Sequence, residues 1–556
     1  MADSSLPAAS DAAFEPPHPG SPDMPPWTAA ELPAAPIFRA RNWFALLGPG
    51  LLMGGAAIGG GEWLAGPAVT AKYGGALLWL ATLSIVGQVF YNIEISRYTL
   101  YTGEPIFTGK FRTLPGPWVW LWVYIALDFG SVFPYLAANA ATPLAAVCLG
   151  RIPSPVQDQM LLKSLAYAIF LIGMIPLIFG GKIYNTLKWI MSFKIVMVLG
   201  FLLVLAAFHS SWNTWYEIGT GFFRFGTVPI ANPADTNGNG KVDPGEDWDG
   251  KPQTQNVFSA WWAGEPIGAI DFSMIGWLAT LVAIAGQGGL SNAPISNYTR
   301  DQGWGMGRHV GAIPSVVGGH NIALSHVGCV FQVTRETLVR WRGWLRHVRR
   351  DQLFVWMPAC FLGMALPSML SVEYLPRGIN AANDWTTAGM TANGVQDHVA
   401  AAWGSLWGSL AWYLTLLCGF LALGPTVSTQ ADGLVRRWVD VGWTASRQLR
   451  ALDPKYIKQL YFGVLVAFVA LGLVMLAFNS PAELLKITAN LNNLALGFSC
   501  FHCLAINLIL LPRELRPRWP ARVALLLSGV FFCSMFVIWL VAAIANARAG
   551  GTLLEM

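Results

Sequence analysis

Long apolar runs recur along the whole chain, and few charged residues interrupt them. Two examples are LLWLATLSIVGQVF at 77–90 and VALLLSGVFFCSMFVIWLVAAIA at 523–545. An apolar stretch of about 20 residues is long enough to cross a bilayer as a helix. The pattern predicts eleven membrane-spanning helices, at residues 44–71, 75–100, 117–149, 161–180, 188–208, 270–297, 352–372, 401–425, 457–478, 484–511 and 522–546.

The composition agrees with this pattern, because 54% of the residues are hydrophobic and only 12% are charged. A soluble protein of this composition would expose apolar patches that water does not wet. The chain is therefore expected to be an all-α integral membrane protein of a plasma or inner membrane. Most of the seven cysteines lie inside apolar runs, so no disulfide framework is implied.

The basic residues predict the orientation of the spans. Lys and Arg are concentrated in cytoplasmic segments of membrane proteins, and this chain has eight of them in the segment 298–351. Their distribution places the N-terminus in the cytoplasm and the C-terminus outside. The moderately apolar stretch 309–333 is interpreted as a loop, because a twelfth span there would spoil the charge asymmetry.

These spans divide the chain into five parts. The first 40 residues are rich in Pro and Ala and lack the basic start and apolar core of a signal peptide. The expected parts are a disordered cytoplasmic tail (1–40), a first five-helix repeat (41–208), an outer loop (209–269), a second five-helix repeat that includes the basic loop 298–351 (270–511), and an eleventh helix with the C-terminus (512–556).

Two spans carry glycine clusters near their centres. The first span contains AAIGGGEWLAGP at 56–67, and the sixth contains GQGG at 286–289. Such glycines unwind a helix where its backbone lines a cavity, or they allow close helix packing. Breaks at matching places in spans one and six are typical of an inverted five-plus-five repeat, with the substrate between the broken helices.

The sequence around the first break also resembles a known family. GPGLLMGGAAIGGGEWLAGPAVTAKYG at 48–74 is similar to the first helix of Nramp-type divalent metal transporters, and SRYTLYTGEP at 96–105 resembles the end of their second helix. The likeness extends loosely over spans one to ten. It implies the LeuT fold and a secondary active transporter.

The chain departs from the family at the metal site. At the positions of the family's Asp-Pro-Gly-Asn motif stand Gly59, Gly60, Gly61 and Glu62. In the sixth helix, Gly286 stands at the methionine position and is followed by Gln287, Gly288 and Gly289. The thioether that favours late transition metals is therefore absent, as is the family's proton-linked histidine.

These departures favour a hard divalent cation such as Mg²⁺, which keeps several waters and needs a wide cavity. A small organic solute is an alternative, since its carboxylate could bind at a half-helix N-terminus. A third alternative is a membrane sensor of the same fold that binds without transport. The candidate substrate-binding residues are Gly59, Gly60, Gly61, Glu62, Gly286, Gln287, Asn490 and Asn493.

Two carboxylates inside the spans are candidates for proton coupling. An unpaired charge at the bilayer centre costs about 3 kcal/mol on insertion scales, so Glu62 is expected to bind substrate or protons, or to pair with Arg97 or Lys72. The resemblance implies a coupling role for Asp128, and a structural helix cap is the alternative. Glu94 is expected to pair with Arg97, three residues later on the same helix face.

The tenth span contains several amide side chains. Asn490 and Asn493 share one face at a spacing of three residues, and they are expected to line the pathway or to form hydrogen bonds between helices.

A calcium-binding motif lies in the outer loop. DTNGNGKVDPGE at 235–246 fits the pattern D-x-[DN]-x-[DN]-G-x5-E. A solvated turn is the alternative, but the match predicts one structural Ca²⁺ with the oxygen ligands Asp235, Asn237, Asn239, Lys241, Asp243 and Glu246.

The remaining expectations concern partners and catalysis. The basic segment 298–351 suits a helix on the membrane surface. The net charge of +5 follows from the cytoplasmic excess of basic residues, so nucleic acid is not an expected partner. We find no nucleophile elbow, P-loop or clustered carboxylate pair, and we expect neither an enzyme nor a self-contained ATP-driven pump. The oligomeric state is not predicted.

Overall fold

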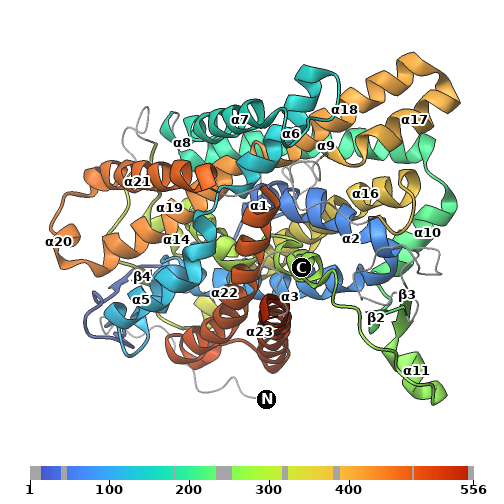
Figure 1. Cartoon of the computed structure of the whole chain (residues 1–556). Helices are drawn as coiled ribbons and strands as arrows, with labels where there is room; N and C mark the ends of the chain where they lie inside the picture. Colours follow the sequence, from blue (N-terminus) through green and yellow to red (C-terminus); the bar gives the residue numbers. More distant parts are fainter. Residues whose placement is uncertain are drawn as a thin grey trace.

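The computed structural model describes residues 14–38, 47–179, 182–232, 253–315, 323–379, 389–478 and 481–548. These residues form a bundle of helices with two small two-stranded sheets at its periphery (Figure 1). Eight of the described helical stretches are long and apolar enough to cross a membrane. Together with the broken first and sixth spans and the second span, they give the eleven spans predicted from the sequence.

The first five spans are built from ten helical segments. Span one is interrupted at Ile58, and span three at Phe133 and Pro134. In chain order the segments are α1 (Pro49–Ala57), the π-helical turn η2 (Gly61–Ala65) and α2 (Gly66–Tyr73); α3 (Trp79–Thr102); α5 (Pro117–Asp128), η4 (Phe129–Val132) and α6 (Tyr135–Leu149); α7 (Gln159–Ile172) with α8 (Ile175–Ile178); and α9 (Ile183–His209). Short helices η3 (Gly74–Leu77) and α4 (Ile106–Arg112) connect spans one to three.

The second five spans again begin with a broken helix. They consist of α12 (Ile275–Ile284), η5 (Gly289–Asn292) and α13 (Pro294–Asp301); η6 (Gln352–Trp356) with α16 (Met357–Tyr374); α18 (Ser405–Leu423) with α19 (Thr426–Ala445); α21 (Ile457–Phe478); and α22 (Pro481–Ile509). The eleventh span, α23 (Trp519–Arg548), packs against α22 and α3.

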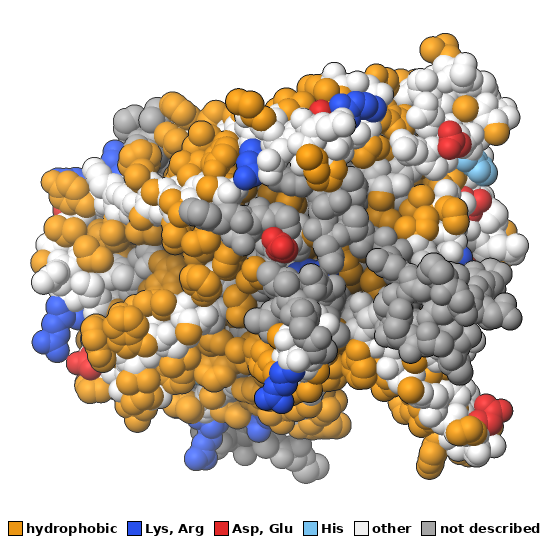
Figure 2. All heavy atoms as spheres, in the orientation of Figure 1, with side chains coloured by type: hydrophobic (Ala, Val, Ile, Leu, Met, Phe, Trp, Pro, Cys, Tyr) orange, Lys and Arg blue, Asp and Glu red, His pale blue; other side chains and the backbone are white. Residues whose placement is uncertain are grey.

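The outer surface of the bundle is apolar. Large hydrophobic side chains point outward from several spans, for example Trp122 on α5, Phe208 on α9 and Leu527 on α23. Figure 2 shows such side chains covering much of one face of the molecule. A surface of this kind is stable against lipid and not against water. The prediction of an all-α integral membrane protein is confirmed.

The eighth span differs from its prediction, which ended it at residue 425. A second helix, α19, follows α18 after Gly424 and Pro425, and the two form one bent element of 41 residues. The predicted end was too early, because the apolar run used to bound the span stops where the more polar residues of α19 begin. Most side chains of α19 are buried, and this includes Arg436 and Arg437.

The prediction of a loop at 309–333 agrees with the described part of that stretch. It contains only the end of α14 (Gly307–Val310) and the short strand β4 (Cys329–Val330). The basic residues that follow form α15 (Arg335–Asp351), which continues directly into η6 and α16. Its apolar side is buried in the protein, through Leu338, Trp341 and Trp344 among others.

The N-terminal segment corrects another prediction. Residues 14–38 are not a disordered tail, because they lie against the helical bundle. The strand β1 (Thr28–Ala29) pairs in parallel with β4, and Met24, Trp27 and Leu32 are buried. Few apolar residues are enough to dock this segment, since the neighbouring loops supply hydrogen-bonding groups.

An ion pair between Glu104 and Arg112 anchors the N-terminal segment. Arg112 donates one hydrogen bond to the carbonyl of Pro25 (2.8 Å) and two to the carboxylate of Glu104. Burial raises the pKa of Glu104, but the charge and hydrogen bonds of the Arg112 guanidinium lower it by more. The pKa of Glu104 therefore lies below the ordinary 4.5. The backbone N–H of Ser21 donates to the Arg112 carbonyl (2.7 Å). Arg112 therefore binds the N-terminal segment through both its side chain and its backbone.

The predicted outer loop contains α10 (Trp212–Gly221), β2 (Thr227–Ile230), β3 (Gln253–Asn256) and α11 (Val257–Ala263). The strands β2 and β3 are antiparallel, so they bring together the two ends of the segment that carries the calcium motif. The motif itself, residues 235–246, lies outside the described residues.

Candidate functional site

The break in the sixth span is a true unwinding of the helix. Gly286, Gly288 and Gly289 have positive φ angles of 99°, 70° and 58°, in the left-handed region that residues with a side chain rarely adopt. The chain between α12 and η5 therefore depends on glycine at all three positions. This confirms the break that the GQGG cluster predicts.

A glutamine from the second span satisfies the unwound backbone. Gln88 on α3 accepts hydrogen bonds from the N–H groups of Gln287 (3.0 Å) and Gly288 (3.1 Å) and from the Asn292 side chain. Its amide group donates to the carbonyl of Ala285 (2.7 Å). Buried backbone groups without partners would be costly in a membrane, so Gln88 stabilises the break. The sequence analysis did not identify this residue.

The break in the first span is shorter, and its glycines serve mainly close packing. Helical geometry is lost around Ile58, and Gly60 and Gly61 have right-handed helical φ angles. A Cβ atom at Gly61 would lie 2.2 Å from the carbonyl oxygen of Ile284, and one at Gly60 would lie 2.6 Å from the ring of Tyr135. The absence of side chains thus allows the two broken spans to touch.

Glu62 links the two breaks. One oxygen of its fully buried carboxylate accepts a hydrogen bond from the N–H of Gly286 (2.9 Å), and the other accepts one from Gly59 (3.3 Å). Of the two alternative partners, Arg97 pairs with Glu94, and Lys72 donates to Ser273. The ion pair predicted between Glu94 and Arg97 is confirmed, at 2.7 Å.

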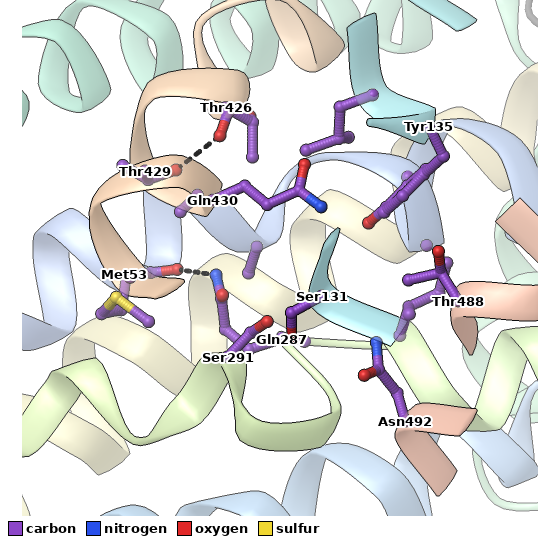
Figure 3. Close-up of a pocket in the computed structure, with 18 of the residues that line it drawn as sticks. Met53, Ser131, Tyr135, Gln287, Ser291, Thr426, Thr429, Gln430, Thr488 and Asn492 are labelled. Carbon is purple, nitrogen blue, oxygen red and sulfur yellow. Dashed lines mark hydrogen bonds between the residues drawn. The ribbon is translucent and has the colours of Figure 1, made fainter. Parts of the chain in front are cut away.

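A polar cavity lies where the two breaks meet (Figure 3). Hydroxyl and amide groups share its lining with apolar residues such as Met53, Leu136 and Ile284, and the centre of a water molecule can move through about 40 Å³ of its interior. No acidic side chain lines it within the described part of the chain. The lining residues come from the first, third, sixth, eighth and tenth spans, and their polar members are Ser131, Tyr135, Gln287, Ser291, Thr426, Thr429, Gln430, Arg437, Thr488 and Asn492.

The structure brings together half of the predicted substrate-binding residues at this cavity. Gly60, Gly61, Gly286 and Gln287 line it, and the Gln287 side chain donates to the carbonyl of Met53 (2.8 Å). The remaining predicted residues, Gly59, Glu62, Asn490 and Asn493, are buried beside the cavity without lining it.

The tenth span presents different side chains from those predicted. Thr488 and Asn492 line the cavity, whereas Asn490 donates to the Lys486 carbonyl of its own helix. Asn493 donates to the carbonyl of Ala279 on α12 (2.9 Å). This is a hydrogen bond between helices, the second of the two roles expected for it. The side of α22 that faces the cavity was misjudged, because three asparagines within four residues point in different directions and do not show which of them faces the cavity.

Asp128 forms a buried ion pair next to the cavity. Its carboxylate accepts hydrogen bonds from Arg437 (2.6 Å), from the Trp438 indole (2.8 Å) and from Ser131 (2.6 Å). Arg437 also donates to the carbonyl of Leu290 in η5. These contacts connect the third, sixth and eighth spans beside the cavity.

One wall of the cavity was missed because the predicted eighth span ended at residue 425. Thr426, Thr429, Gln430, Gly433 and Arg437 face the cavity from this helix. They recur at spacings of three and four residues, which is the helical repeat. This spacing of small and polar residues after Pro425 was the signal available in the sequence.

No group of three or more His, Cys, Asp or Glu side chains that could hold a metal ion occurs among the residues that the structure describes. The sequence CFHC at 500–503 of α22 does not form such a group, and His502 is within hydrogen-bonding distance of Thr113 and Tyr124. A metal ligand set of the ordinary acidic type is therefore not part of the described cavity.

The fold is shared with solved transporter structures. A mutant of the manganese transporter of Eremococcus coleocola superposes with a TM-score of 0.58 at 11% sequence identity, over 93% of this chain and 90% of that one. The same transporter with an aromatic bis-isothiourea substituted compound gives 0.55 at 12% identity, over 91% and 88%. No protein-family model and no curated protein sequence matches the chain. These likenesses confirm the LeuT-like five-plus-five fold.

Proposed function

We propose that the protein is a secondary active transporter whose substrate occupies the cavity between the two broken spans. The observation that carries this proposal is the cavity itself, which is polar, buried and lined by both breaks. In transporters built from inverted repeats, the substrate lies at such breaks near the middle of the membrane. Movement of spans one and six against the third, eighth and tenth would open the cavity to one side at a time.

A hard divalent cation such as Mg²⁺ is the proposed substrate. The helices α1 and α12 both end at the cavity, and the C-terminal end of a helix carries a partial negative charge. The available ligands are mainly oxygen atoms, which hard cations prefer. In Figure 3 the sulfur of Met53 points away from Ser131, Tyr135 and Gln430, so a soft metal would gain little.

The size of the cavity supports an ion rather than a large molecule. Its interior space of about 40 Å³ holds a few water molecules, since one water needs about 10–15 Å³ on this measure. A partly hydrated ion fits this space, and it could exchange waters for the Gln287 and Asn492 oxygens. Proton coupling is part of the same proposal, because Glu62 and Asp128 lie directly behind residues that line the cavity.

A small polar organic solute is the second candidate, and one observation favours it. Within the described residues Arg437 is the charged side chain that lines the cavity, and its charge is balanced by Asp128. A divalent cation buried without a negative side chain is costly, whereas a neutral or zwitterionic solute could use the hydroxyl and amide groups directly.

Transport by the purified protein in liposomes tests the proposal. A trapped Mg²⁺ indicator should report uptake above that of protein-free liposomes, with slower uptake of Cd²⁺ under the same gradient. A panel of small amino acids and other polar solutes, added as competitors, tests the second candidate. Binding of Mg²⁺ without flux would instead support a sensor of this fold, and folded protein that neither binds nor moves any of these compounds would refute the proposal.

A further inference from the structure

Lys194 is a fully buried lysine in the middle of α9. Its ammonium group donates one hydrogen bond to the carbonyl of Ala422 (2.6 Å) and another to the hydroxyl of Thr426. No carboxylate within the described residues lies close enough to form an ion pair with it, although the charge of Glu62 acts on it electrostatically. A buried charge held by only two neutral oxygens is costly.

The position of Lys194 couples it to the cavity. Ala422 and Thr426 stand on either side of the bend between α18 and α19, and Thr426 lines the cavity. The helix α9 also packs against α1, where a Cβ atom at Gly55 would lie 2.7 Å from the Cβ of Met191. The ammonium group therefore lies where the first broken span, α9 and the bent eighth span meet.

The charges around Lys194 leave Glu62 as its electrostatic counterpart. The helices α1 and α8, which pack against α9, contain no titratable residue. Buried thiols are contributed by α16 (Cys360) and α18 (Cys418), and Tyr135 of α6 interacts with Glu62. All four charged side chains in the buried part of α19 are in ion pairs: Asp432, Arg436, Arg437 and Asp440.

We propose that Lys194 carries the proton that couples transport, which rests on the proposed transport function. The ammonium form binds Ala422 and Thr426 and holds α9 to the bent eighth span while the cavity is closed. When the cavity opens, the ammonium transfers one proton to water, and the neutral amine binds the Ala422 carbonyl and the Thr426 hydroxyl more weakly, which lets α9 separate from the eighth span. Lysine suits this role because its charge is readily lost in buried sites, whereas arginine keeps its proton.

The variants Lys194→Met and Lys194→Arg, compared with Lys110→Met, separate this role from a structural one. Lys110 is equally buried, and its ammonium donates to the hydroxyl of Ser499 on α22 rather than to the eighth span. Hydrogen exchange of peptides from α1, α18 and α19, corrected for intrinsic rates, is measured at pH 6.5 and 8.5 without substrate. The wild type and Lys110→Met should exchange faster at the higher pH, and both Lys194 variants should lose this difference.

Proton movement provides the second readout. In liposomes with an interior pH dye, Mg²⁺-driven proton flux should fall by at least about tenfold in Lys194→Arg, a loss of roughly 1.4 kcal/mol in the coupled step. Wild-type pH dependence of exchange in both Lys194 variants would overturn the proposal. If Lys194→Met does not fold, the pH dependence of exchange in Lys194→Arg decides whether the proposal holds, since this variant keeps the positive charge. Absence of Mg²⁺ flux in the wild type would count against the substrate alone, because the exchange experiment needs no substrate.

Discussion

The contact between the two broken spans at Gly61 provides a sharp test of the site geometry. In the variant Gly61→Ala, the new methyl group would lie 2.2 Å from the carbonyl oxygen of Ile284, where an ordinary contact begins at 3.4 Å. The two backbones would have to separate by about 1.2 Å, which would also stretch the 2.9 Å hydrogen bond between Gly286 and Glu62. Overpacking of this kind costs about 1–3 kcal/mol, more than the helix propensity that alanine adds, about 1 kcal/mol.

Thermal melting of the purified protein measures this effect, with Gly200→Ala as the matched control. Gly200 lies within α9, and a Cβ atom there would meet no atom within 4 Å. The control should therefore melt at or slightly above the wild-type temperature, whereas Gly61→Ala should melt several degrees lower and lose transport. Equal melting temperatures and equal transport in both variants would show that the spans do not meet at Gly61.

Three further predictions concern other parts of the molecule. Asp128→Asn should lower the free energy of unfolding by about 3–5 kcal/mol, because it leaves Arg437 buried without its partner. In thermal melts, the double variant Asp128→Asn with Arg437→Met should lose less stability than the two single variants added together, and strict additivity would argue against the ion pair. The pKa of Glu104 lies below 4.5, so the stability that its ion pair contributes is complete above pH 4.5 and is lost only as the pH falls through the lower pKa of the folded protein. Limited proteolysis of the N-terminal segment should therefore proceed at the same rate from pH 5.5 to 8, and it should be faster in Arg112→Met. A proteolysis rate that changes with pH in that range would contradict the ion pair as the anchor of the segment. If residues 235–246 bind Ca²⁺, saturation at one hundred times Kd stabilises the fold by about 2.7 kcal/mol; Glu246→Ala or a chelator should then lower the melting temperature, and identical curves with Ca²⁺, Mg²⁺ and chelator would indicate a plain turn.

The fold could be predicted from the sequence because its signals are local. Apolar runs mark the spans, and the glycines at 286–289 mark a backbone that requires positive φ angles. These signals depend on a few neighbouring residues and not on tertiary contacts. The resemblance of 48–74 to a transporter helix pointed to the same architecture.

The candidate site could be predicted only in part, because its other members are set by tertiary contacts. Gln88 is one of several polar residues of α3, and only the folded chain shows that it meets the unwound backbone of the sixth span. The polar repeat of α19 resembles a solvated helix until its cavity face is seen. The N-terminal segment has few apolar residues, and its docking depends on Arg112, far along the chain.

Uptake of Mg²⁺ by two variants of the same helix tests the central claim most directly. Asn492 lines the cavity, whereas Asn490 is buried two residues away and bonds to its own helix. Loss of a polar contact to a desolvated substrate costs about 1–3 kcal/mol. Initial uptake into liposomes should therefore fall by about tenfold or more in Asn492→Leu and stay near the wild-type rate in Asn490→Leu. Wild-type uptake in Asn492→Leu, or the larger loss in Asn490→Leu, would contradict transport through this cavity.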